Sequence, residues 1–311
     1  MDRTGSRGGP GRRNRASLAF AAGALLALIG SFAKFPDPLR AAQPQTVPVL
    51  NVTPAPAVQG DTLMIAVAAP ANADVDLRFD GARIATFPLS GDQWRGLIGT
   101  DPDVAVGSHT VTVAVVETGG APLRVSLTVR VLAGHFGVRS LTLPPTTFSL
   151  ITPQNLAIER RVLAPVLGRR TPVARWSGTF QAPSTGTMDS PYGLQGVYNG
   201  HREWWHGGMD YSAPAGSPVV AANAGVVALA QALPLGGNTI VIDHGQGVLT
   251  EYLHLLAFTV HPGATVERGA TIGAIGATGL VTGPSLHWGL YVNGIPVNPL
   301  FWMEPRPGLT L

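Results

Sequence analysis

The feature that most constrains the fold is a repeated pattern of short apolar runs, each closed by glycine or proline. The 311-residue chain holds 39 Gly and 27 Pro, residues that interrupt helices and mark turns. Between residues 47 and 132 apolar and polar side chains alternate, which is typical of strands with one buried face. The clearest runs are Val75, Leu77 and Phe79; Val111, Val113 and Val115; and Leu123, Val125, Leu127, Val129 and Val131. The pattern predicts an all-β chain.

The alternating runs also predict how this first region folds. Asp80-Gly81 closes one run with a typical hairpin turn. Several strands within about 85 residues favour an immunoglobulin-like β-sandwich over 47–132, with Trp94 and Leu97 joining its core. His109 stands alone in this region, and we interpret it as a surface or packing residue. The domain has either a spacer or substrate-positioning role or a purely structural one.

Residues 133–177 are expected to connect two domains. Pro144-Pro145 interrupts the chain, and 153–167 predicts one short helix with Leu156, Ile158 and Val162 facing inward. Four arginines of this region are interpreted as a solvated face, with a binding patch as the alternative; they are Arg160, Arg161, Arg169 and Arg170.

The remainder, 178–302, again predicts strands and few helices. Gly236-Gly237-Asn238 and Asp243-His244-Gly245 are expected to be turns, with His244 structural, and His261 is expected in an exposed turn. Periodicity alone indicates only a second all-β domain. The expected strands are 219–220, 226–229, 239–242, 248–252 and 286–292.

Two histidines and an aspartate carry the strongest chemical signal. His206 and Asp210 lie in His-Gly-Gly-Met-Asp, and His287 lies in Gly-Pro-Ser-Leu-His-Trp. Two imidazoles and one carboxylate suit Zn²⁺, and three protein ligands leave a fourth position free for water, as in catalytic zinc sites. The set predicts one zinc ion per chain.

Ordered motifs surround these residues. After the His206 segment come Tyr-Leu-His-Leu at 252–255, Gly-Pro-Ser-Leu-His-Trp at 283–288 and Val-Asn-Gly-Ile-Pro-Val-Asn-Pro at 292–299. In order and spacing the stretch 178–302 resembles the lysostaphin or LytM family of zinc endopeptidases, which cut peptide bonds in bacterial peptidoglycan. The resemblance implies an antiparallel β-sheet peptidase domain whose groove holds zinc, followed by a tail at 303–311.

The resemblance also implies residue roles. His206, Asp210 and His287 correspond to the family's zinc ligands, and His254 to one of its two catalytic histidines. The other catalytic histidine, the first of His-x-His, is replaced by Ser285, which should point to the same strand face as His287. A serine hydrogen-bonds but does not accept a proton near neutral pH as imidazole does. Nearby aromatic or imidazole groups that could line the groove, supply a base or simply pack are His201, Trp204, Trp205 and Trp288.

The N-terminus predicts export. Residues 1–33 hold five Arg before an apolar run and fit a signal peptide, with an uncleaved membrane anchor as the alternative, and 34–46 fit a linker. The chain has no cysteine, and net charge outside 1–33 is about −1, which argues against nucleic-acid binding. We therefore expect a periplasmic or envelope protein whose partner is the peptide stem of peptidoglycan, touching membrane only through an uncleaved N-terminal segment.

Two functions of different class follow. The first is an exported zinc metalloendopeptidase that hydrolyses peptidoglycan cross-links and tolerates Ser285. The second is a zinc-retaining, catalytically impaired relative that binds cell wall or activates another wall hydrolase. Retention of all three metal-ligand positions favours the enzyme.

Overall fold

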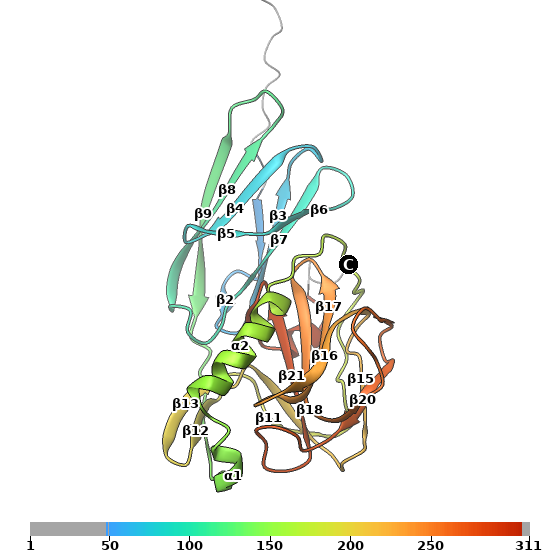
Figure 1. The fold of residues 1–311 in the computed structure, drawn as a ribbon. Helices are drawn as coiled ribbons and strands as arrows, with labels where there is room; N and C mark the ends of the chain where they lie inside the picture. The colour runs from blue at the N-terminus through green and yellow to red at the C-terminus, as the bar shows by residue number, and fades with distance from the viewer. Residues whose placement is uncertain (1–47, 49, 307–311) are drawn as a thin grey trace, which may run out of the picture. The chain divides into compact units, whose positions relative to one another are not determined.

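A computed structural model describes residue 48 and residues 50–306 of the chain. The predicted signal peptide at 1–33 and linker at 34–46 lie outside the described residues. Within the described part strands predominate, as the sequence predicted (Figure 1). None of its helices is long and apolar enough to cross a membrane.

The first region contains two sheets that share one apolar core. One sheet has the order β1-β3-β7-β6 and the other β2-β9-β8-β4-β5. Apolar side chains of both sheets meet in a single buried cluster, so the region is a β-sandwich; that it is immunoglobulin-like stays a prediction. The hairpin expected at Asp80-Gly81 joins β4 to β5. The strands are β1 (Leu50–Thr53), β2 (Ala57–Val58), β3 (Thr62–Ala68), β4 (Asp74–Phe79), β5 (Ala82–Ile84), β6 (Thr86–Pro88), β7 (Gln93–Gly99), β8 (Gly107–Val116) and β9 (Leu123–Leu132).

Strand β7 corrects one core prediction. Trp94 and Ile98 pack in the sandwich core, whereas Leu97 is fully buried in the apolar cluster of the C-terminal domain. The reason is the strand's two-residue period: Leu97 faces away from the side that carries Trp94 and Ile98. Asn293 Nδ2 donates to the Leu97 carbonyl at 2.6 Å, and Arg95 hydrogen-bonds Gln246, so polar contacts surround this apolar junction.

The C-terminal domain is built on a ten-stranded sheet. Its main path is β11-β14-β21-β18-β17-β16-β19, with β15, β20 and β22 attached, and its pairings are antiparallel. Its strands are β11 (Thr187–Ser190), β14 (Gly208–Ser212), β15 (Pro218–Val220), β16 (Gly225–Leu233), β17 (Gly237–Gly245), β18 (Val248–Phe258), β19 (Thr265–Val266), β20 (Thr271–Ile275), β21 (Ser285–Val292) and β22 (Ile295–Val297), and the short helix α3 (Leu300–Met303) follows.

The turn predicted at residues 243–245 is wrong. His244 lies within β17, fully buried, and the chain reverses after Gly245 instead. His244 Nδ1 donates to the Ala224 carbonyl at 2.7 Å, and Nε2 lies 2.7 Å from the Thr250 hydroxyl. Its structural role is as expected, and His261 is exposed as expected.

The segment predicted as a connector is instead built into the C-terminal domain. Strand β10 (Val138–Leu141) pairs in parallel with β12 (Gln195–Tyr198), which pairs with β13 (His201–Trp205). After the short helix α1 (Pro145–Phe148), helix α2 (Pro153–Leu167) occupies the residues predicted for it, and the Thr152 side chain caps its first turn.

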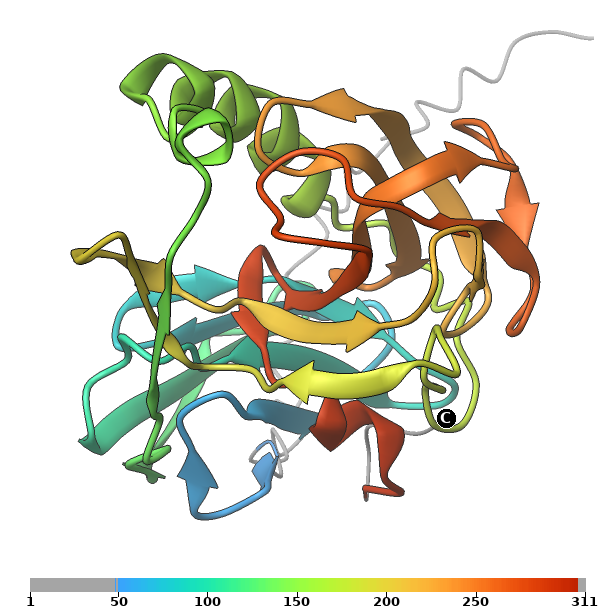
Figure 2. The ribbon, with the colours of Figure 1, turned by 90° about the horizontal axis from the view of Figure 1, so that it is seen from below.

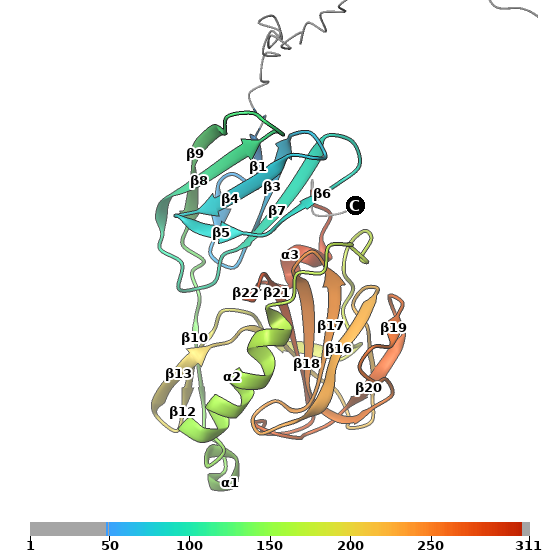
Figure 3. The ribbon, with the colours of Figure 1, turned by 45° about the horizontal axis from the view of Figure 1, so that its top comes forward.

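Helix α2 packs against the sheet through the C-terminal part of its apolar face. Val162, Leu163, Val166 and Leu167 share a cluster with side chains of β16, β17 and β18, and Figure 3 shows the helix beside these strands. Ile158 was predicted to face inward and is half-buried, but it does not join this cluster. The four arginines that the sequence assigned to a solvated face are exposed; they are Arg160, Arg161, Arg169 and Arg170.

Candidate metal centre and surrounding cavity

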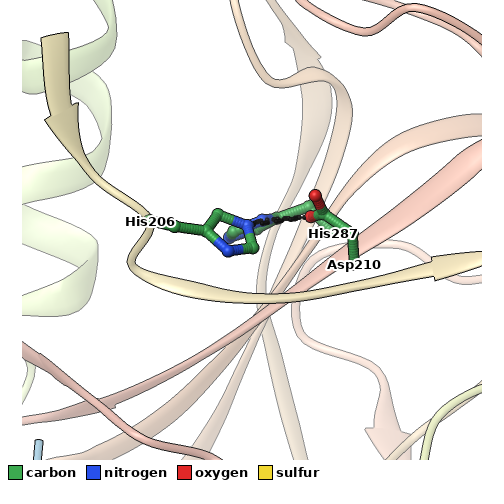
Figure 4. Close-up of side chains that lie close together, drawn as sticks. All are labelled: His206, Asp210 and His287. Carbon is green, nitrogen blue, oxygen red and sulfur yellow. Dashed lines mark hydrogen bonds and ion pairs between the residues drawn. The ribbon is translucent and has the colours of Figure 1, made fainter. Parts of the chain in front are cut away.

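The three predicted metal ligands converge on one point (Figure 4). His206 Nε2 lies 2.9 Å from Asp210 Oδ1 and 3.0 Å from His287 Nδ1, and the last two atoms are 3.0 Å apart. Ligands about 2.0–2.1 Å from a tetrahedral zinc ion lie roughly 3.3 Å from one another. The triangle therefore has nearly the size that the donor atoms of a zinc site require.

The sheet register creates this triangle. Asp210 on β14 pairs directly with His287 on β21, so their side chains leave the same face of adjacent strands. His206 precedes β14 by two residues. Gly208 allows the approach, because a Cβ there would come 2.4 Å from the Trp288 carbonyl oxygen and 2.8 Å from His287 Nε2.

Outer hydrogen bonds orient two of the three ligands. His206 Nδ1 lies 2.8 Å from the Pro191 carbonyl, which can only accept, so the proton is on Nδ1 and Nε2 offers its lone pair to the centre. Asp210 turns Oδ1 to the histidines, while Arg139 Nη1 donates to its Oδ2 at 2.9 Å. Donor type, spacing and outer support all fit a zinc ion.

The cluster's electrostatics keep its carboxylate ionised. Burial by itself raises the pKa of Asp210, but the adjacent imidazoles of His206 and His287 outweigh it and hold that pKa well below its usual range. Burial lowers the pKa of His287, which favours the neutral imidazole that a metal requires.

His254 reaches the centre from a bulge in β18. Pairing with β17 shifts register between Asn238 and Ile240, which leaves His254 in the left-handed region with φ of 65°. Its Nδ1 donates to the Thr278 carbonyl at 2.9 Å, so Nε2 is the basic nitrogen, and the ring lies 6.4 Å from that of His287. Burial, with the neighbouring His287, lowers the pKa of His254 to about 4, so the ring is neutral at physiological pH.

Ser285 lies two residues before His287 on β21 and lines the same cavity as the metal cluster. Its hydroxyl makes a long contact of 3.4 Å to the Tyr211 carbonyl. His201, considered as a substitute base, is instead exposed, stacks on Phe148 and does not line this cavity. Trp204 and Trp205 line the cavity, whereas Trp288 is fully buried in the core.

The cluster opens into a cavity of about 480 Å³. Helix α2 forms one side through Leu156, Glu159 and Leu163, and strands β10, β12 and β13 contribute the other; Figure 2 shows the green helix and the yellow hairpin. The cavity thus draws on the segment predicted as a connector. The sequence assigned no cavity role to Arg139, Glu159 or Glu251, although Glu251 directly precedes the Tyr-Leu-His-Leu motif, because their proximity arises from the tertiary fold.

Comparison with known proteins agrees with this architecture. The profile of Peptidase family M23 matches residues 205–299. Residues of the chain are 46% identical over 95 positions to peptidoglycan DD-endopeptidase ShyA of Vibrio cholerae, covering 30% of this chain and 22% of that protein. They are 42% identical over 123 positions to the DD-carboxypeptidase/endopeptidase Mpg of Neisseria meningitidis, covering 40% and 28%.

The chain spans less than a third of the length of these relatives. A crystal structure of a Pseudomonas aeruginosa protein described as an M23 peptidase shares the fold, with a TM-score of 0.60 and 24% identity over 79% of this chain and 94% of that one. The site has the donor set of a metallopeptidase. Residues 205–299 of the C-terminal domain therefore form a domain of Peptidase family M23, the lysostaphin or LytM family.

Proposed function

We propose that this protein is an exported zinc metalloendopeptidase that hydrolyses peptide cross-links of peptidoglycan. The observation that carries the proposal is the convergence of His206, Asp210 and His287 within 3.0 Å of one another at the wall of a cavity that also contains His254. The relatives named for peptidoglycan DD-endopeptidase activity support the substrate class. The basic and apolar segment at 1–33 supports export to the periplasm or envelope.

The residues divide the chemical work. His206, Asp210 and His287 would hold one zinc ion, which would supply Lewis-acid polarisation of a scissile carbonyl and would lower the pKa of water at the site. His254 is neutral and presents Nε2, so it can accept the proton of the attacking water and return it to the leaving amine. Ser285 can donate a hydrogen bond to the developing oxyanion but cannot take a proton.

The second candidate is a zinc-retaining protein that binds wall peptides or activates another hydrolase. Ser285 favours it, since loss of one acid–base group costs roughly 10²–10⁴-fold in rate. No other histidine among the described residues joins His206, His254 and His287 along the cavity.

One experiment separates these functions. The purified protein is assayed for zinc by elemental analysis and for digestion of purified peptidoglycan, beside His206→Ala and the surface control His261→Ala. We expect about one zinc per chain in the wild type and control, soluble peptide products from both, and neither in His206→Ala. Bound zinc without digestion selects the binding function, and a zinc-free wild type from zinc-rich growth contradicts both.

A further inference from the structure

A second polar group faces the cavity some distance from the metal cluster. Glu251 on β18 is only 2% exposed, and it lines the cavity together with Tyr291 and Pro296. Its Oε2 accepts a hydrogen bond from the Tyr291 hydroxyl at 3.0 Å, while its buried Oε1 has no partner. Buried carboxylate oxygens are almost always satisfied, so Oε1 is available to a hydrogen-bond donor of a bound ligand.

The register fixes where Glu251 stands relative to the metal cluster. Glu251 pairs with Gly289, which lies two residues beyond His287 on the same strand face. Such diagonal neighbours are roughly 7–8 Å apart. Glu251 therefore lies two residues along the strand from the position opposite the metal ligand His287, on the same face of the sheet.

Two glycines, Gly289 and Gly207, add no side chains to the part of the cavity between the metal cluster and Glu251. Gly289 places no side chain opposite Glu251, and a Cβ there would come 3.1 Å from the Tyr291 ring. A Cβ at Gly207 would meet only Pro296 and the Tyr291 hydroxyl, at 3.6 and 4.0 Å. The cavity therefore has space for a ligand that extends from the metal cluster to Glu251.

The charged groups around Glu251 favour a ligand that carries a positive charge. Glu159 of α2 lines the same part of the cavity, and its Oε1 accepts from the backbone N–H groups of Leu235 and Gly236. Among the described residues that line the cavity Arg139 is the one Lys or Arg, and its guanidinium is committed to Asp210. Burial, with Glu159 nearby, raises the pKa of Glu251 to about 7, so the group gains from a cationic partner.

We propose that Glu251, positioned by Tyr291, is a substrate-binding residue that receives a primary ammonium group of the peptide bound at the metal cluster. This inference rests on the proposed function and adds a specificity to it. The ligand class is a peptide with a diamino-acid residue beside the scissile bond, whose flexible aliphatic stem carries a compact ammonium with three donors. The alternative source of the same chemistry is a free α-amino group.

Three synthetic peptides test the proposal. Each contains lysine followed by D-alanyl-D-alanine: the first is acetylated only at the α-amine, the second at both amines, and the third only at the side-chain amine. Their dissociation constants are measured by calorimetry at pH 7.5 with the full chain carrying His254→Asn, which prevents cleavage. The same background then receives Glu251→Gln or, as a control, Glu267→Gln at an exposed turn.

We expect the first peptide to bind about ten- to a hundredfold more tightly than the second, the range of a hydrogen-bonded charge. Glu251→Gln should remove this difference while binding the doubly acetylated peptide unchanged, which shows that the variant is folded, and Glu267→Gln should preserve it. Preference for the third peptide assigns the subsite to an α-amine and overturns the diamino-acid specificity.

A wild-type Glu251 protein that does not distinguish the first two peptides, whether both bind or neither does, overturns the subsite. A difference that survives Glu251→Gln overturns it equally. The proposed function stands or falls separately, because zinc content and peptidoglycan digestion are measured on protein with Glu251 intact and without these peptides.

Discussion

Arg139 should strengthen metal binding although it is not a ligand and lies outside the region that the family profile matches. Its guanidinium donates to Asp210 Oδ2 at 2.9 Å and fixes the carboxylate so that Oδ1 faces the histidines. Loss of such an outer partner typically weakens metal affinity 10–100-fold, or about 1.4–2.7 kcal/mol. Because the Arg139 side chain is 32% exposed, solvent screening places Arg139→Ala near the lower limit, about tenfold.

Zinc dissociation constants from competition with a chromogenic chelator measure this effect. Arg139→Lys retains the charge without the planar fork and should recover only part of the affinity. Arg83→Ala is the matched control, since it removes an exposed ion pair with Asp76 in the sandwich, and should leave the affinity unchanged. A zinc dissociation constant of Arg139→Ala within twofold of the wild-type value would refute the assignment. Tighter zinc binding by Arg139→Ala would also refute it, because Arg139 would then compete with the metal for the Asp210 carboxylate.

Three further outcomes are expected. Ser285→His should raise peptidoglycan digestion by an order of magnitude or more, and Ser285→Ala should leave zinc affinity within twofold; an inert Ser285→His in an active protein means that another group serves as base. His254→Asn, which tolerates the positive φ better than alanine, should abolish digestion with zinc content unchanged, and loss of zinc would instead make it a ligand. Burial lowers the pKa of His244 to about 4, so the unfolded state binds more protons than the folded state below about pH 6.5. The free energy of unfolding should therefore fall by about 3 kcal/mol as the pH drops from about 6.5 to 4. In denaturant unfolding, His244→Gln should show a smaller dependence of that free energy on pH over this window, and a dependence identical to that of the wild type contradicts the assignment.

The three residues of the metal cluster could be singled out because each lies in a short motif that is readable locally. His206 and Asp210 are four residues apart in one motif, and His287, 81 residues further on, was joined to them through the resemblance of its motif to the lysostaphin family. Hairpin and strand positions were predictable for the same reason, as at Asp80-Gly81, where the turn residues themselves set the conformation.

Features that depend on tertiary contacts were not predictable. Leu97 has the apolar character of a sandwich-core residue, and only the packing of β7 against a second domain decides which of its two faces is covered. The bulge at His254 arises from a register shift between two strands, and Arg139 meets Asp210 because β10 pairs with β12. None of these leaves a mark in periodicity.

The incorporation of β10 and α2 into the cavity has a consequence for recombination. An exchange of residues 205–299 between relatives would transfer the three metal ligands. It would leave behind Arg139 and helix α2, which forms one side of the cavity. Hybrids joined near residue 133 should therefore receive the metal ligands and the surrounding cavity wall from the same parent, whereas hybrids joined near residue 205 would combine the ligands of one parent with the cavity wall of the other. The part of the chain that forms the cavity is therefore longer than the stretch that carries the metal-ligand motifs.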